Sequence, residues 1–163
     1  MQFRPATIND IDSLKELALS SWQQFEESLS TDDWNELYLA LDKVDYGALV
    51  ESANGVVCTV GDDAIVGMAF LVPSGNPTDI FPGDWCYVRM VTVDVNYNGM
   101  GIGRGLMSRC IEQARGQGEI TVGLHTAEFM NKARHIYESM GFKIVRELGR
   151  RFGKKYWLYQ LDL

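Results

Sequence analysis

The residues in this chain best suited to chemistry are glycines at the junction between a predicted strand and a predicted helix, in the segment Asn98-Gly99-Met100-Gly101-Ile102-Gly103-Arg104. Valines alternate before this segment, as in a half-buried strand, and apolar residues recur after it at helical spacing. The start of a helix presents backbone N–H groups that have no partner within the helix, together with the positive end of the helix dipole. Glycines let a ligand approach that backbone closely. The segment therefore indicates a binding site for phosphate.

Two common phosphate-binding motifs do not fit this segment. The dinucleotide-binding motif Gly-x-Gly-x-x-Gly would require glycine where Arg104 or Leu106 stands, and the Gly-Lys-Ser/Thr sequence of a Walker loop is absent. The segment resembles instead the acetyl-CoA motif of the GCN5-related N-acetyltransferase (GNAT) family, Gln/Arg-x-x-Gly-x-Gly/Ala. Asn98, Gly101 and Gly103 occupy its defined positions. Asn98 departs from the motif because its side chain has less reach than that of glutamine or arginine.

A second segment resembles another motif of the same family, in which Asn-x-x-Ala-x-x-x-Tyr-x-x-x-Gly-Phe follows the fifth strand. Ala133, Tyr137, Gly141 and Phe142 match this spacing, whereas the asparagine is one residue late, at Asn131. The resemblance implies that Asn131 contacts the pantetheine arm and that Tyr137 hydrogen-bonds the CoA sulfur and acts as general acid. A tyrosine hydroxyl suits this role because, with a pKa of about 10, it is protonated at neutral pH and can still supply a proton to a thiolate. A purely structural core aromatic is the alternative for Tyr137.

The general base is less apparent. Some family members carry a catalytic glutamate on the central strand, at a position where this chain has Tyr87. His125, at the end of a predicted fifth strand, has a pKa range suited to deprotonating an amine, although its position alone favours a structural histidine. Glu128 or Asp84 acting through water are further candidates. In this family an ordered water chain often replaces a dedicated base.

The resemblance also implies how the rest of acetyl-CoA binds. The pantetheine arm pairs like an added strand with the backbone of Val91, Thr92 and Val93. A backbone N–H near Val91, where the family carries a bulge, polarises the thioester carbonyl. The pyrophosphate takes the N–H groups of residues 99–104. Arg104 either adds charge there or is an ordinary surface arginine of the helix, which is the default. Acetyl-CoA is thus the expected cofactor, used as a co-substrate, and we expect no metal site.

Composition excludes several classes of protein. The three cysteines are odd in number and lack Cys-x-x-Cys spacing, which argues against a disulfide framework and against zinc. The absence of a long apolar run and of a signal-peptide pattern predicts a cytoplasmic protein that does not contact a membrane. The formal net charge of −7 argues against nucleic acid as a partner.

The charges are divided unevenly along the chain. Residues 1–83 contain 14 acidic and 3 basic residues, whereas residues 84–163 contain 8 acidic and 12 basic ones. The basic half suits an anionic cofactor and the acidic half suits a cationic amine, but ordinary solvated surface explains the division equally well. In the resembled family the first two helices and their connection form part of the acceptor site, which implies a candidate amine-binding rim of Glu26, Glu27, Asp32, Asp33 and Glu36. For Asp32 and Asp33 we favour the alternative that acidic residues near a helix start complement the helix dipole.

The length of 163 residues predicts a single domain over residues 1–163. The resemblance implies the GNAT fold, of the α+β class and layered α/β/α, whose mixed, mostly antiparallel central sheet of about six to seven strands is flanked by about four helices. Alternation along the central strand places Tyr87, Arg89, Val91 and Val93 on one face. The predicted strands are 3–7, 56–60, 64–72, 84–95, 120–125, 142–148 and 154–163. The predicted helices are 11–22, one capped by Thr31, 101–115, and one capped by Thr126.

These motifs predict an acetyl-CoA-dependent N-acetyltransferase. The acetyl group passes to a primary amine, either a small molecule or a peptide N-terminus, by direct attack in a ternary complex. A catalytically weak acyl-CoA-binding sensor or partner protein is the alternative, supported by the missing strand carboxylate and the displaced asparagine. A second alternative is an enzyme that uses a longer acyl-CoA or a hydroxyl acceptor. The C-terminal strands could pair across a homodimer.

Overall fold

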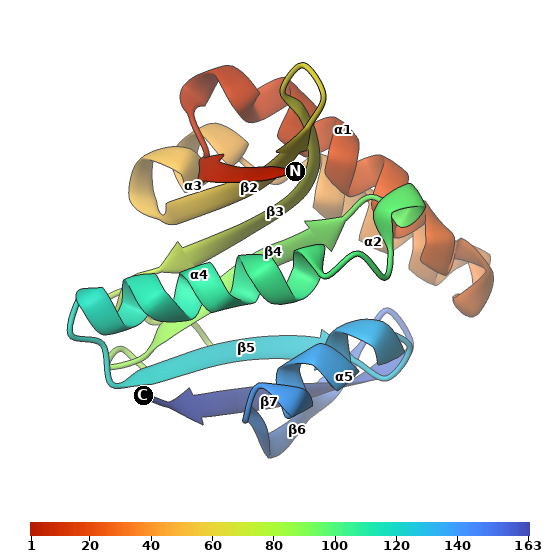
Figure 1. Ribbon diagram of the computed structural model, residues 1–163. Helices are drawn as coiled ribbons and strands as arrows, with labels where there is room; N and C mark the ends of the chain where they lie inside the picture. The colour runs from red at the N-terminus through yellow and green to blue at the C-terminus, as the bar shows by residue number, and fades with distance from the viewer.

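A seven-stranded sheet with helices on both faces forms the framework of the protein in the computed structural model, which describes all of residues 1–163 (Figure 1). The strand order is β1-β2-β3-β4-β5-β7-β6, and every pair is antiparallel except β4 with β5. The predicted α+β class and mixed sheet are confirmed. The strands are β1 (Gln2–Pro5), β2 (Asn54–Val60), β3 (Ala64–Val72), β4 (Cys86–Val93), β5 (Thr121–Ala127), β6 (Lys143–Arg151) and β7 (Lys154–Asp162).

Five α-helices are present, one more than the sequence predicts. They are α1 (Ile11–Trp22), α2 (Thr31–Asp42), α3 (Tyr46–Ser52), α4 (Ile102–Gly116) and α5 (Asn131–Ser139), with short 3-10 helices η1 (Ile8–Asp10), η2 (Gln23–Ser28) and η3 (Val95–Tyr97). The unpredicted helix is α3, which is capped by Asp45 through a 2.9 Å hydrogen bond from the Ala48 N–H. Seven residues are too few to show a clear helical period. None of the helices combines the length and apolar character needed to cross a bilayer.

Two predicted helix caps are wrong. The N-cap of α2 is Ser30, whose Oγ accepts a 3.1 Å hydrogen bond from the Asp33 N–H, and Thr31 is the first residue of the helix. Thr126 belongs to β5, which runs two residues further than predicted. Its hydroxyl donates to Met130 Sδ at 3.3 Å, and α5 begins only at Asn131. Serine and threonine are both good caps, so their order in the chain alone does not select between them.

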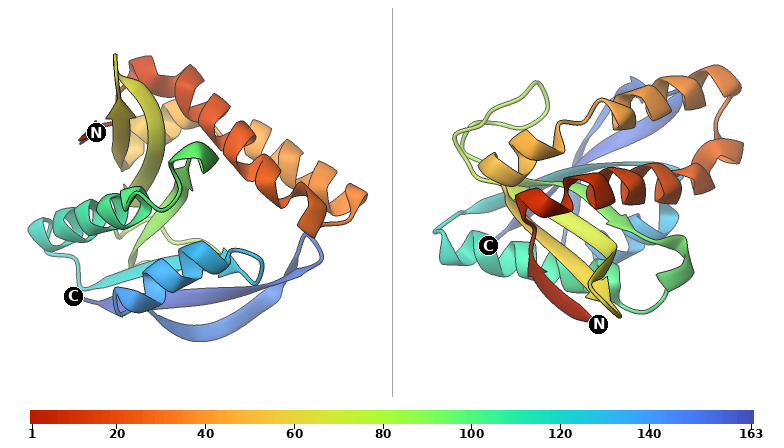
Figure 2. Two further views of the ribbon diagram at one scale, coloured as in Figure 1. Left: turned by 45° about the vertical axis from the view of Figure 1, so that its right-hand side comes forward. Right: turned by 90° about the horizontal axis from the view of Figure 1, so that it is seen from above.

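Two apolar layers hold the helices against the sheet. On one face, α4 and α5 bury Leu106, Cys110 and Tyr137 against the inner residues of β2–β5. On the other, α1 and α3 bury Leu14 and Leu49 against the same strands. Helix α2 packs on α1 through a third cluster and lies further from the sheet (Figure 2). The sheet thus separates α4 and α5 from α1, α2 and α3.

A bulge in β4 overturns the predicted alternation along this strand. Met68 pairs with Thr92 and Phe70 pairs with Arg89, so two residues of β4 stand opposite one residue of β3. The first of the two, Met90, has φ +55°, a left-handed conformation unusual for a residue with a side chain. Val91 and Val93 consequently join the layer under α4, and do not share the face of Tyr87.

Candidate active site

The two parallel strands at the centre of the sheet pair over only part of their length. Cys86 pairs with Val122 and Tyr87 with Gly123, and no pairing continues beyond these residues. Strand β4 nevertheless runs to Val93 and β5 to Ala127. The strands therefore separate toward their C-terminal ends, and the backbone groups of β4 on the side of β5 are free to bind a ligand there.

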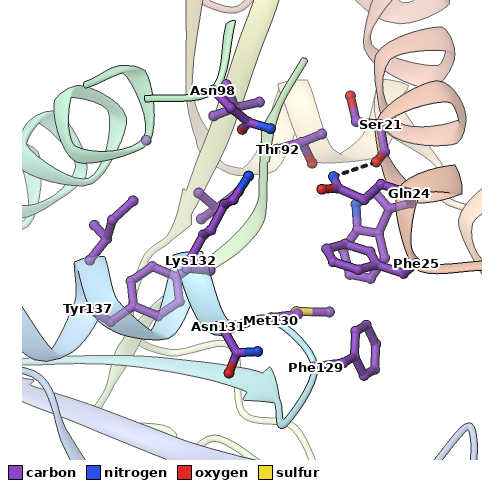
Figure 3. Close-up of a pocket in the computed structure, with 16 residues that line it drawn as sticks. Ser21, Gln24, Phe25, Thr92, Asn98, Phe129, Met130, Asn131, Lys132 and Tyr137 are labelled. Carbon is purple, nitrogen blue, oxygen red and sulfur yellow. Dashed lines mark hydrogen bonds between the residues drawn. The ribbon is translucent and has the colours of Figure 1, made fainter. Parts of the chain in front are cut away.

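A cavity of about 300 Å³ lies at this open end and reaches both faces of the sheet (Figure 3). Val91 and Val93 line it on the α4 side, whereas Ser21 and Trp22 line it from α1, on the opposite side. A molecule bound on one face can thus meet a molecule bound on the other. The lining residues are Ser21, Trp22, Gln24, Phe25, Val91, Thr92, Val93, Asn98, Gly103, Phe129, Met130, Asn131, Lys132, Ala133, Ile136 and Tyr137.

The start of α4 has the properties of an anion site. Gly101 is the N-cap, with φ +78°, and no side chain caps the helix. The first N–H groups of α4 therefore lack partners within the helix, at the positive end of its dipole. A Cβ on Gly99 or Gly101 would meet nothing within 4 Å, so the space beside this backbone is open. These features fit the phosphates of coenzyme A.

The predicted cofactor residues lie around this helix start, with different surroundings. Asn98, Gly103 and Asn131 line the cavity, as do Val91, Thr92 and Val93 of β4. Met100 is exposed, while the Ile102 side chain is buried in the core, so that only the backbone of Ile102 is available to a ligand. The Arg104 guanidinium donates a 2.6 Å hydrogen bond to Ser139 Oγ. Arg104 is thus held between α4 and α5.

Tyr137 lies in the wall of the cavity on α5. It is 6% exposed, and its ring packs edge-on against Phe142 at a centroid distance of 6.1 Å. Only Tyr159 among the tyrosines uses its hydroxyl in a hydrogen bond, so the Tyr137 hydroxyl has no protein partner. Burial raises the pKa of Tyr137 well above its ordinary value, and the hydroxyl is protonated at neutral pH.

His125 is not brought into the cavity with Tyr137. It points to the opposite face of β5, between the rings of Phe81 and Tyr156, with centroid distances of 6.0 and 5.9 Å. Its Nδ1 is buried without a hydrogen-bond partner. Burial, followed by the positive charges of Arg151 and Arg89, lowers the pKa of His125 to about 4. The imidazole is therefore neutral at neutral pH.

The other residues considered as bases also lie outside the cavity lining. Glu128 accepts a 3.1 Å hydrogen bond from the Lys155 N–H, and Asp84 is exposed just before β4. Tyr87, which stands where some relatives carry a glutamate, is buried and stacks on Phe81 at a centroid distance of 4.2 Å. No carboxylate lines the cavity.

A sequence model described as the acetyltransferase (GNAT) family matches residues 11–142. The chain belongs to this family. The match spans the β4 bulge, the helix start and Tyr137, and it confirms the resemblance that the two motifs carry. No curated protein sequence matches the chain significantly.

Solved structures share the fold of this GNAT protein at low sequence identity. The PaiA N-acetyltransferase of Thermoplasma acidophilum, in complex with coenzyme A, has a TM-score of 0.80 at 14% identity, covering 99% of this chain and 98% of that one. A ribosomal-protein-alanine N-acetyltransferase from Brucella melitensis has a TM-score of 0.71 at 22% identity, with full coverage of both chains. The putative acetyltransferase yncA of Salmonella typhimurium, with acetyl-CoA, has a TM-score of 0.71 at 21% identity, covering 100% and 94%.

The cavity of this GNAT protein lacks the acidic rim expected around an amine. None of the acidic residues of η2 and α2 lines the cavity, where Lys132 is the sole charged residue. The side chains found there instead include Ser21, Phe25 and Phe129, which sequence reasoning did not select. Trp22 lies on the apolar face of α1, and the helical pattern of apolar residues cannot distinguish a cavity wall from a core.

Proposed function

We propose that this protein is an N-acetyltransferase that transfers the acetyl group of acetyl-CoA to a primary amine, a small molecule or a peptide N-terminus, by direct attack. The whole chain, residues 1–163, acts as a single acetyltransferase domain. The observation that carries this proposal is the cavity that crosses the sheet where β4 and β5 separate. It lets the cofactor and the amine approach one point from two faces, as a ternary complex requires.

Acetyl-CoA supplies the acetyl group as a thioester. The backbone N–H groups of residues 99–104 bind its phosphates, with Arg104 adding positive charge at the surface. The free backbone edge of Val91, Thr92 and Val93 pairs with the pantetheine arm. Asn98 and Asn131, which line the cavity, hydrogen-bond the amide groups of this arm in the proposed complex.

Catalysis needs the carbonyl to be polarised and the departing sulfur to receive a proton. A backbone N–H of the β4 bulge, at Met90 or Val91, stabilises negative charge that develops on the carbonyl oxygen. Tyr137 donates its proton to the sulfur. Burial raises the pKa of Tyr137 and so weakens it as an acid. The same burial raises the pKa of a thiol beside it, so the pKa values of proton donor and acceptor shift in the same direction.

The amine loses its proton on the other side of the sheet. His125 lies on that face with a neutral imidazole and acts as the base. Since His125 does not line the cavity, the proton reaches it through intervening water. A pKa of about 4 makes it a weak base, which suits removal of a proton from nitrogen after bond formation has begun, when that proton is more acidic.

Release of free thiol from acetyl-CoA tests the proposal. Pools of acceptors would contain polyamines, amino acids, aminoglycosides, arylalkylamines and short peptides with free N-termini. Release above the hydrolysis rate in any pool, accompanied by mass gain of one acetyl group on the amine, supports the transferase. Acetyl-CoA binding by calorimetry without turnover in any pool would contradict it and favour the sensor protein.

A further inference from the structure

The end of the cavity away from Tyr137 is formed largely by aromatic and apolar side chains. Trp22 comes from α1, Phe25 from η2, and Phe129 and Met130 from the connection between β5 and α5. Figure 3 shows Phe25, Met130 and Phe129 gathered at one end and Tyr137 at the other. Because three separate elements contribute, this arrangement is a product of the tertiary fold.

The aromatic rings form a connected series. The Trp22 and Phe25 centroids lie 5.7 Å apart with planes at 73°, and those of Phe25 and Phe129 lie 5.1 Å apart at 62°. These edge-to-face contacts present ring faces as well as edges to the cavity. All three rings are partly exposed, so this end communicates with solvent.

A hydroxyl at this end lacks the partner that burial demands. Ser21 is 3% exposed, and its Oγ makes no hydrogen bond in the protein. Gln24 Nε2 donates to the backbone carbonyl of Ser21 at 2.7 Å, which holds the Gln24 amide beside the same wall. Buried polar atoms usually have partners, so a ligand or water is expected to satisfy Ser21 Oγ.

We propose that this aromatic end selects the acceptor, a primary amine that carries an aromatic ring or an apolar group of similar size. The inference rests on the proposed function. The apolar group contacts Trp22, Phe25 and Phe129, and the amine end, directed toward the β4 bulge, has Ser21 Oγ and Gln24 Oε1 as neighbouring acceptors. The cavity has no carboxylate that could bind a polyamine, and the positive charge of Lys132 repels a polyamine.

The position of the aromatic end assigns it to the acceptor and not to a long acyl chain. Its walls come mainly from α1 and η2, across the sheet from the start of α4 where the cofactor phosphates bind. Its partly exposed rings provide an entrance from solvent that is separate from the start of α4. A second substrate needs such an entrance, whereas an acyl chain arrives attached to the cofactor.

Kinetics with matched amines test this proposal. With acetyl-CoA, phenethylamine should exceed both ethylamine and spermidine in kcat/KM by about tenfold or more. Phe25→Ala and Phe129→Ala should each remove most of that preference while the KM for acetyl-CoA stays unchanged. Tyr38→Ala is the control, because Tyr38 is an exposed aromatic on α2 outside the cavity. Circular dichroism would verify that each variant remains folded.

Three results would overturn the proposal. Equal kcat/KM for phenethylamine and spermidine would show that the protein does not select aromatic amines. An unchanged preference in both phenylalanine variants would show that the aromatic end does not bind the acceptor. Faster reaction of hexanoyl-CoA than acetyl-CoA with ethylamine, abolished by Phe25→Ala, assigns the aromatic end to the acyl chain.

If the protein acetylates no amine, the proposed function fails. Calorimetry of phenethylamine with CoA-saturated protein then tests the aromatic site independently of turnover. Binding weakened by Phe25→Ala supports the aromatic site, and absence of binding refutes it.

Discussion

His125 and Tyr137 lie on opposite faces of the central sheet. His125 lies between Phe81 and Tyr156 on the face covered by α1 and α3, whereas Tyr137 packs in the layer of α4 and α5. The residues proposed to remove and to supply protons are therefore not adjacent. The open end of β4 and β5 is the passage that connects their two faces.

Tyr137→Phe should lower kcat by about 100-fold or more, because the departing sulfur loses its proton donor. The Kd for acetyl-CoA should change less than about twofold, since the ring and its contact with Phe142 are retained. Stopped-time thiol release and calorimetry measure the two quantities. Tyr38→Phe, on an exposed helix face, is the matched control. Unchanged kcat in Tyr137→Phe would exclude tyrosine as the general acid.

His125 should make the stability of the protein depend on pH between about 4 and 6.5. Its pKa falls from 6.5 in the unfolded chain to about 4 in the fold, so the unfolded state binds more protons in this window. Stability is therefore full above pH 6.5 and decreases as the pH falls toward 4, by at most about 3 kcal/mol. Urea unfolding at half-unit pH steps measures this slope.

His125→Phe should flatten that slope, because the ring is retained and the titrating group is lost. His135→Gln, on the exposed side of α5, should keep the wild-type slope. The same slope in His125→Phe and wild type would show that other groups cause the pH dependence.

The motifs made the family predictable, together with the local structure around the expected cofactor site. The glycines before α4 and the spacing from Ala133 to Phe142 are local in sequence, and both the helix start and Tyr137 are where this spacing indicates. Local rules succeed here because a helix start and a single helical turn depend on few residues.

The aromatic end of the cavity, which we propose for the acceptor, was not predictable, because it depends on long-range packing. Trp22 and Phe129 lie far apart in the chain, and the fold brings both to one cavity, where each ring packs against Phe25. The alternation of residues did not show the β4 bulge, which only the resemblance to the family indicated near Val91. Met90 carries no sign in its residue type that it adopts positive φ, and this one residue moves Val91 and Val93 to the other face.

Ser30→Ala should destabilise the protein by about 1 kcal/mol, because it removes the oxygen that caps α2. Thr31→Ala should change stability by less than about 0.5 kcal/mol, since Thr31 occupies a helical position. Thermal and urea unfolding of the two variants compare the caps directly. A larger loss of stability in Thr31→Ala than in Ser30→Ala would show that Thr31 is the N-cap, as the sequence suggested.

Gly101→Ala should destabilise the protein by about 1 kcal/mol and weaken acetyl-CoA binding. A residue with a Cβ is strained at φ +78°, although no atom stands in its way, and relief of that strain rotates the N–H groups at the start of α4. Gly116→Ala is the control at the other end of the same helix, where φ is not positive and an added Cβ also meets nothing within 4 Å. Its stability should equal or exceed that of wild type, because alanine favours helix. Calorimetry with acetyl-CoA and urea unfolding measure both effects. Equal Kd values of Gly101→Ala and Gly116→Ala for acetyl-CoA would show that the start of α4 does not contribute to cofactor binding.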